Sequence, residues 1–194
     1  ITIRAPYGGG VHGALYHSQS VEALFANQPG LKIVMPSTPY DVKGLLKAAI
    51  RDNDPVLFFE HKRAYRLIKG EVPDDDYVLP IGKADVKREG EDLTIITYGL
   101  CVHFALQAAE KLAQDGISAH ILDLRTVYPL DKEAIIEAAS KTGKVLLLTE
   151  DNKEGSTMSP RLWSLLAILT VGAAVSTPRS AHALAVQTSV TPVA

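Results

Sequence analysis

The sequence contains few of the residues that mark secreted, membrane or nucleic-acid-binding proteins. Its 194 residues include a single cysteine, Cys101, which excludes an internal disulfide framework and a cysteine-based metal cluster. One cysteine also fits a reducing compartment. The formal net charge is −2, so nothing attracts the chain in general to nucleic acid or to an anionic membrane. The apolar run at 162–175 is shorter than the about 20 residues that cross a bilayer.

The N-terminal residues lack an initiator methionine and a signal peptide. Ile1 to Arg4 read like the middle of a β-strand, so we expect the chain to be a fragment. Hydrophobic residues make up 46% and charged residues 22%, which is ordinary for a globular protein with a buried core.

A glycine-rich loop follows this first strand. Gly8, Gly9 and Gly10 cannot form the interior of a helix or strand, because each costs backbone entropy and packs nothing. They are not followed by the Gly-Lys-Ser/Thr of a phosphate loop. His12 and His17 then lead from the loop into a predicted helix. A flexible loop that carries imidazoles to a helix start is a common way to build an active site.

Strands and helices are predicted to alternate along the rest of the chain. Thr38 is a helix N-cap with Pro39 at the first helical position and Asp41 in a capping-box position. The segments predicted as strands are 31–35, 56–59, 84–87, 93–98, 118–124 and 144–149, and the predicted helices run from 39 to about 50, from 100 to 114 and from 131 to 139. This order predicts an α/β fold with mostly parallel sheets.

Two segments break the pattern. Residues 67–82 combine acidic residues with two prolines and are interpreted as an inter-domain linker. Residues 160–194 contain only two charged residues, Arg161 and Arg179.

Several motifs, in the right order, closely resemble the beta subunits of thiamine-diphosphate-dependent 2-oxo acid dehydrogenases. The branched-chain (2-oxoisovalerate) type is the most similar. The resemblance covers 1–159, whereas 160–194 do not match. The motifs are Gly13-Ala14-Leu15-Tyr16-His17-Ser18-Gln19-Ser20, Pro29-Gly30-Leu31-Lys32, Pro36-Ser37-Thr38-Pro39, Phe58-Phe59-Glu60-His61-Lys62, Asp123-Leu124-Arg125-Thr126-Val127-Tyr128-Pro129-Leu130-Asp131 and Thr149-Glu150-Asp151.

The resemblance implies a division into domains. Residues 1–66 correspond to the second half of a pyrimidine-binding domain, and 83–159 to part of a transketolase-like C-terminal domain. The absent first half normally carries the glutamate that activates the cofactor, so we expect the chain alone to be inactive. The tail at 160–194 is interpreted as an out-of-frame reading of the same gene. An incomplete C-terminal domain is expected to expose apolar surface.

The resemblance also implies the reaction and its residues. The family decarboxylates a 2-oxo acid on thiamine diphosphate and passes the acyl group to a lipoyl arm. The family's general acid/base matches His17, and Tyr16 and His12 are candidates for lining the same cofactor site. Packing or backbone capping is the alternative for His12, and packing is the more ordinary role for Tyr16. The diphosphate and its Mg²⁺ belong mainly to the alpha subunit.

A monovalent-cation site is implied near Asp52-Asn53-Asp54. The family takes carbonyl oxygens at the positions of Ile1, Thr2, Ala49 and Asp52, with a side chain at Asp54, and K⁺ is the usual ion. The role is structural. A polar turn before Pro55 is the alternative.

The expected partners are an alpha subunit, in a heterotetramer, and the lipoyl-bearing dihydrolipoyl transacylase core. The expected location is the bacterial cytoplasm or, in a eukaryote, the mitochondrial matrix. The basic residues Lys62, Arg63 and Arg66 lack the aromatic pattern of a nucleic-acid site, and a solvated face or subunit contact explains them. A pyruvate or acetoin dehydrogenase beta subunit and a non-catalytic docking fragment stay open as alternatives.

Overall fold

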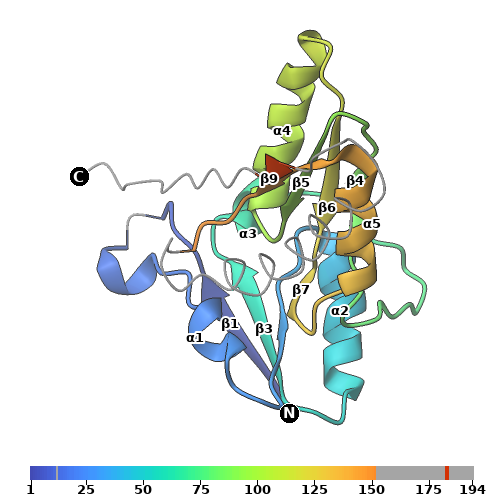
Figure 1. The fold of residues 1–194 in the computed structure, drawn as a ribbon. Helices are drawn as coiled ribbons and strands as arrows, with labels where there is room; N and C mark the ends of the chain where they lie inside the picture. The colour runs from blue at the N-terminus through green and yellow to red at the C-terminus, as the bar shows by residue number, and fades with distance from the viewer. Residues whose placement is uncertain (12, 152–181, 184–194) are drawn as a thin grey trace.

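The computed structural model describes residues 1–11, 13–151 and 182–183. Within these ranges the chain forms two β-sheets with helices packed on them (Figure 1). The first sheet has the strand order β1-β3-β2-β7 and the second β4-β6-β5-β8-β9. The predicted α/β fold with mostly parallel sheets is confirmed.

The first sheet is built around β3 (Val56–His61), which is buried at all six positions. Strands β1 (Thr2–Tyr7) and β2 (Lys32–Val34) flank β3 and run parallel to it. Strand β7 (Thr126–Tyr128) comes from the second half of the chain and pairs antiparallel with β2. The first sheet therefore takes one of its four strands from beyond the predicted linker.

Helix α2 (Pro39–Arg51) begins where the sequence predicts. The Thr38 hydroxyl accepts a hydrogen bond from the Asp41 amide, and Pro39 occupies the first turn. The apolar face of α2 packs on one face of the first sheet through Leu45 and Ala49, against Val56 and Phe58 of β3. Val56 and Phe58 share a face because alternate residues of a strand point the same way.

The other helices of this half are short. They are the single 3₁₀ turn η1 (Leu15–His17), α1 (Glu22–Ala26) and α3 (Ala64–Leu67). The predicted helix after the glycine loop is thus one 3₁₀ turn. Helix α3 lies in the basic stretch, where no helix was expected.

The second sheet follows the predicted alternation closely. Its elements are β4 (Asp85–Arg88), β5 (Leu93–Thr97), α4 (Cys101–Gln114), β6 (Ala119–Asp123), α5 (Lys132–Thr142), β8 (Lys144–Leu147) and β9 (His182–Ala183). Strands β6, β8 and β9 join β5 in a parallel arrangement, whereas β4 is an antiparallel edge. The Asp131 side chain caps α5 by accepting from the Ala134 amide.

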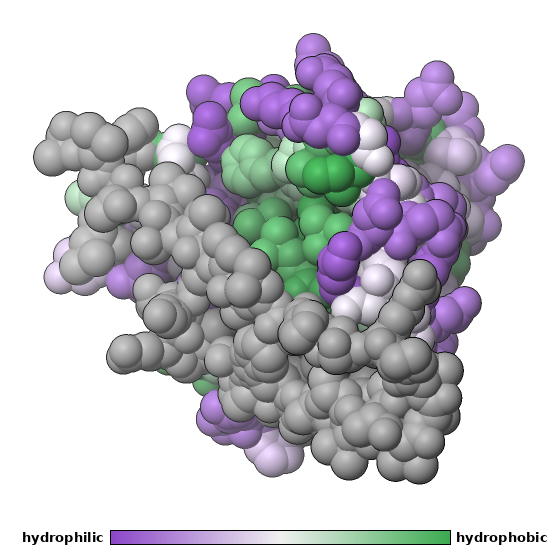
Figure 2. Space-filling model, turned by 45° about the horizontal axis from the view of Figure 1, so that its top comes forward, coloured by the Kyte–Doolittle hydropathy of each residue, from purple (hydrophilic) through white to green (hydrophobic). Residues whose placement is uncertain are grey.

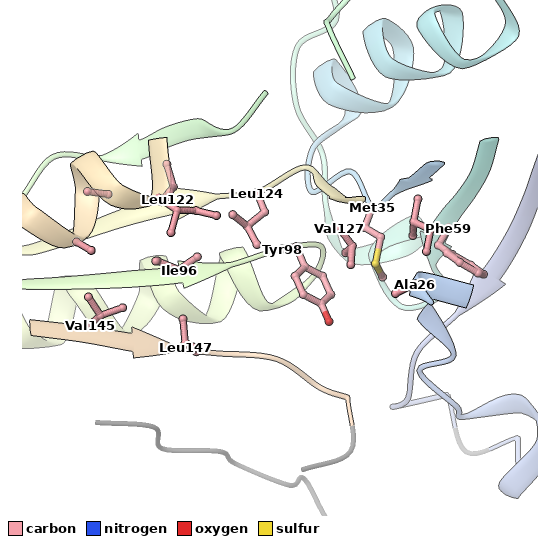
Figure 3. Packing of buried hydrophobic residues seen from close by; sticks show 14 of the residues in the cluster. Ala26, Met35, Phe59, Ile96, Tyr98, Leu122, Leu124, Val127, Val145 and Leu147 are labelled. Atoms are coloured by element: carbon pink, nitrogen blue, oxygen red, sulfur yellow. The ribbon is translucent and has the colours of Figure 1, made fainter. Parts of the chain in front are cut away.

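One hydrophobic core runs through both sheets. Figure 3 shows it passing from Val145 and Leu147 through Tyr98 and Leu124 to Met35 and Phe59. All six side chains are buried. The two halves of the chain are therefore packed as one body.

Residues 68–84 contain no helix or strand, and part of this segment lies along α2. The Tyr77 ring stacks on Tyr40 at a centroid distance of 4.6 Å, and its hydroxyl donates to the Tyr40 carbonyl. Gly44 leaves room for this approach, since a Cβ there would lie 2.6 Å from Leu79 Cγ. The predicted boundaries of the linker stay a prediction.

Apolar side chains are also exposed on the described surface. Figure 2 shows hydrophobic residues gathered in a hollow of one face, bordered by hydrophilic ones. Exposed apolar residues of the second half include Val86, Phe104 and Ile136. Among the described residues, no helix combines the length and hydropathy required to cross a membrane. The tail hypothesis for 160–194 concerns residues that lie, apart from 182–183, outside the described ranges.

Candidate functional site

The glycine loop closes on itself directly after β1. The Gly8 amide donates to the Gln19 carbonyl at 2.9 Å. Gly8 and Gly10 have φ of +88° and +78°, the left-handed region that glycine enters without a steric penalty. The loop thus starts and ends at one place, beside the end of β1.

The loop also needs glycine because it lies against the end of β3. A Cβ on Gly8 would stand 2.1 Å from His61 Nε2, and one on Gly10 would stand 3.0 Å from Arg63 Cδ. The Lys62 amide donates to the Tyr7 carbonyl, and its side-chain ammonium donates to the His17 carbonyl. The sequence His61-Lys62-Arg63 is therefore the floor on which the loop rests.

The structure presents two of the predicted site residues to solvent. Tyr16 is 85% exposed, and His17 is exposed at the end of the η1 turn. His12 lies outside the described residues. An exposed imidazole is free to meet a group carried by another molecule and to exchange a proton with it.

A buried acidic cluster lies below the loop, and sequence reasoning missed it. Tyr98 Oη donates to Glu22 Oε1 at 2.7 Å and lies 2.8 Å from Thr149 Oγ1, whose oxygen also accepts from the Asp151 amide. Burial and the nearby Asp151 raise the pKa of Glu22 to about 7. Among the described residues, Glu22 Oε2 has no hydrogen-bond partner although it is buried. A carboxyl whose pKa lies near neutrality thus joins α1 to the second sheet at this point.

A second contact missed from sequence joins the loop floor to the second half of the chain. His61 Nε2 lies 2.6 Å from Glu150 Oε2, and the His61 side chain is almost fully buried. Tyr7 packs edge-on to the same imidazole, with centroids 5.0 Å apart. Burial, followed by the nearby Glu22 and Glu150, raises the pKa of the Tyr7 phenol, so Tyr7 stays neutral. In the sequence, only the apolar run before His61 pointed toward this pair, because that run implied that His61 is buried.

The residues predicted to hold a monovalent cation lie together at the other end of the first sheet. The Ala49 carbonyl accepts from Thr2 Oγ1 and from the Asp52 amide, and the Ile1 carbonyl accepts from the Val56 amide.

Lys32 Nζ also reaches this cluster, 2.7 Å from Asp52 and 3.1 Å from Asp54. The carboxylates thus have a positive partner already. Within the described ranges, no three His, Cys, Asp or Glu side chains are arranged to hold a metal ion. The cation site stays a prediction that depends on main-chain oxygens.

A network of buried charges connects α2 with the second sheet. Arg125 Nη2 lies 2.6 Å from Asp41 and 3.0 Å from Asp85, and Lys87 Nζ lies 3.0 Å from Asp41. Asp123 accepts from the Arg125 amide and from the Ser37 hydroxyl, whereas the Arg125 side chain turns toward Asp41.

Comparison with known proteins places these features in a class. Residues 1–68 match the transketolase pyrimidine-binding domain, and residues 82–166 match the transketolase C-terminal domain. The two domains in this order define a transketolase-type subunit, and the pyrimidine-binding domain is typical of thiamine-diphosphate enzymes.

Individual relatives narrow the class. The chain is 89% identical over 159 residues to the 2-oxoisovalerate dehydrogenase subunit beta of Bacillus subtilis, covering 82% of this chain and 49% of the relative. It is 57% identical over 154 residues to the pyruvate dehydrogenase E1 component subunit beta of the same organism, covering 79% and 47%. The chain carries both transketolase-type domains, is similar to the beta subunits of 2-oxo acid dehydrogenases, and spans about half the length of these relatives.

Solved structures agree on the fold. A split-gene transketolase, described as an inactive beta4 tetramer, superposes with a TM-score of 0.70 at 26% identity, covering 96% of this chain and 57% of the other. A transketolase mutant from Pichia stipitis gives a TM-score of 0.58 at 17% identity, with 79% and 24% covered, and supports the fold alone.

Proposed function

We propose that this chain acts as part of the beta subunit of a branched-chain 2-oxo acid dehydrogenase, working with an alpha subunit in a heterotetramer. The observation that carries the proposal is the 89% identity over 159 residues to a 2-oxoisovalerate dehydrogenase beta subunit, against 57% for a pyruvate dehydrogenase beta subunit. The relatives' printed names supply the substrate class.

The loop residues fit thiamine diphosphate at a shared site. Tyr16 offers an exposed flat ring and His17 an exposed imidazole, which suit a planar aminopyrimidine and a proton transfer, respectively. The bound cofactor supplies the electron sink for decarboxylation. Because both side chains face solvent, the other wall, with the diphosphate and Mg²⁺, belongs to the alpha subunit. His12 is proposed to line the same cofactor site.

His17 carries the proton step of acyl transfer. As the acyl group bonds to one sulfur of a lipoyl dithiolane and the S–S bond breaks, the other sulfur leaves as a thiolate and takes a proton from His17. The lipoyl group is borne by the transacylase core, and the exposed η1 turn lets it approach. The Lys62 ammonium holds the His17 carbonyl and so limits the movement of the turn.

A structural K⁺ ion is assigned to the carbonyls of Ile1, Thr2, Ala49 and Asp52. Lys32 is already paired with both Asp52 and Asp54, so the ion contributes mainly by ordering the chain around it. A higher melting temperature in KCl than in choline chloride at equal ionic strength tests this assignment. Equal values would remove it. The bacterial cytoplasm is the proposed location.

Reconstitution tests the catalytic role. The chain is mixed with the alpha subunit of a branched-chain dehydrogenase, thiamine diphosphate and Mg²⁺, and 2-oxoisovalerate oxidation is followed with an artificial electron acceptor. Turnover above that of either chain alone, and faster than with pyruvate, supports the proposal. Preference for pyruvate points to the alternative substrate class, and stable association without turnover on any 2-oxo acid points to a docking fragment. We expect the chain alone to be inactive.

A further inference from the structure

The contact between His61 and Glu150 joins two segments that are 89 residues apart in the chain. His61 ends β3 in the first sheet, and Glu150 lies just beyond β8 in the second. The Nε2–Oε2 distance is 2.6 Å, with 1% of the His61 side chain and 20% of the Glu150 side chain exposed. A short polar contact in so dry a place fixes the two segments relative to each other.

The hydrogen bonds of His61 indicate which nitrogen carries the proton. His61 Nδ1 accepts from the Arg63 amide at 3.2 Å. In a neutral imidazole the other nitrogen then bears the hydrogen. Nε2 is then the donor nitrogen and lies 2.6 Å from Glu150 Oε2, a close contact between opposite partial charges whose direction does not meet the geometry of a hydrogen bond.

The same imidazole supports the loop that carries His17. Gly8 lies so close to it that a Cβ there would stand 2.1 Å from Nε2, and Tyr7 packs edge-on to the ring. The next residue, Lys62, is bonded to the Tyr7 and His17 carbonyls. A rotation of His61 would displace the start of the loop and its Gly8–Gln19 closure.

We propose that His61 and Glu150 are positioning residues: the pair fixes the base of the loop at residues 8–19 to the second half of the chain and so sets where His17 stands. The catalytic consequence of this placement rests on the proposed function. The placement itself depends only on the contacts described.

The chain offers a matched control. Glu89, just beyond the edge strand β4, places its Oε2 3.3 Å from Nδ1 of another buried histidine, His120 of β6. Glu89→Ala therefore removes an acid–imidazole contact that does not touch the loop. Glu150→Gln keeps a side-chain oxygen of the same reach beside His61 Nε2.

Amide hydrogen exchange on the isolated chain tests the placement. In Glu150→Ala we expect the Gly8 and Lys62 amides to exchange about tenfold faster, with the β5 and β6 amides unchanged. Glu150→Gln should recover most of the protection, and Glu89→Ala should leave the loop unchanged. Unchanged loop exchange in Glu150→Ala, or an equal rise throughout the chain, would overturn the proposal.

Kinetics on the assembled enzyme add a second readout. Glu150→Ala should lower kcat for acyl transfer about tenfold while KM for the 2-oxo acid stays the same, because His17 is displaced and substrate binding is not. Absence of turnover in the wild-type assembly would count only against the proposed function. Amide hydrogen exchange would still decide whether the His61–Glu150 pair fixes the position of the loop. Normal kcat in Glu150→Ala would overturn the positioning role.

Discussion

The Tyr98 hydroxyl donates to Glu22 Oε1 at 2.7 Å and so joins the end of β5 to α1. The Tyr98 hydroxyl oxygen also lies 2.8 Å from Thr149 Oγ1. One hydroxyl thus connects three segments at the junction of the two sheets. Glu22, which accepts this hydrogen bond, is buried next to Glu150 and Asp151, and this environment affects the stability of the chain.

Glu22 makes the stability of the chain depend on pH. Burial raises its pKa from 4.5 to about 7, so the folded state holds the proton more tightly than the unfolded state. The stabilising contribution is complete below pH 4.5 and is lost as pH rises through 7, an effect of about 3 kcal/mol at most. Glu22→Gln, which carries no charge, should flatten this dependence.

Urea unfolding at pH 5 and pH 8 measures the effect. The free energy of unfolding should fall less between these values in Glu22→Gln than in the wild type. Asp123, whose pKa burial raises to about 6, contributes with the same sign in both proteins. Identical losses in the two proteins would mean that the pKa of Glu22 is not raised in the folded state.

Asp41 is the central acid of the buried charge network. It is fully buried and lies 2.6 Å from Arg125 and 3.0 Å from Lys87. Burial favours its neutral form, but the Thr38 hydroxyl, Lys87 and Arg125 outweigh burial and lower its pKa. Asp41→Asn leaves two cations with less compensation and should cost about 3–5 kcal/mol in urea unfolding.

An exposed pair provides the comparison for Asp41. Asp76 lies 2.5 Å from Lys47 and is mostly solvent-exposed, so Asp76→Asn should change the free energy of unfolding far less than Asp41→Asn does. Similar losses in the two variants would contradict the central place given to Asp41.

Gly99 is required where the first strand meets the second sheet. Its φ is +57°, and a Cβ would stand 2.1 Å from Tyr7 Oη. Gly99→Ala should therefore lower the melting temperature far more than Gly116→Ala, which pays only the left-handed backbone cost of about 1–2 kcal/mol because nothing lies within 4 Å. Adding Tyr7→Phe to Gly99→Ala should recover part of the loss, and no recovery would mean that the clash is not the cause.

The single cysteine should be unreactive in the folded chain. Cys101 is buried, and burial, with Glu150 and Glu22, raises its pKa to about 12. At pH 8 the thiolate is then about 1,000-fold scarcer than for an ordinary thiol, and a disulfide reagent should react only after urea is added. Rapid labelling of the native chain would show that the start of α4 opens freely.

His17→Gln should separate the two halves of the proposed reaction. Because His17 is exposed, the melting temperature should change little. Acyl transfer to a free lipoyl domain should fall by about 10²–10⁴-fold, while oxidation with an artificial acceptor falls less. Equal losses in both assays would place His17 in cofactor activation instead of acyl transfer.

Local signals in the sequence predicted the elements well. Thr38-Pro39 marked the start of α2, and the residues around Asp131 marked the start of α5, because caps act within one turn. The pattern failed at 15–17, where a helix was predicted after the glycine loop and the structure has a single 3₁₀ turn. It also missed β7, a three-residue strand whose partner is about 90 residues away.

The candidate site shows the same contrast between local features, which were predicted, and long-range contacts, which were not. His17 and the glycine loop were found from motif and backbone chemistry, which are local. Glu22, Glu150 and the His61 contact were not found, because each depends on a partner in the other half of the chain. The same holds for Arg125, whose side chain reaches Asp41, 84 positions earlier in the chain. Long-range pairing is set by packing, which single-sequence patterns do not encode.

The pairing of β7 with β2 means that the second domain contributes a strand to the sheet of the first. Cutting the chain within 68–82, where its sequence suggests a boundary, would remove β7 from the first sheet and leave the backbone groups of β2 open along one side. Such an edge readily recruits another strand. The N-terminal piece on its own would therefore tend to self-associate, and the joint between the domains is a shared sheet, not a hinge.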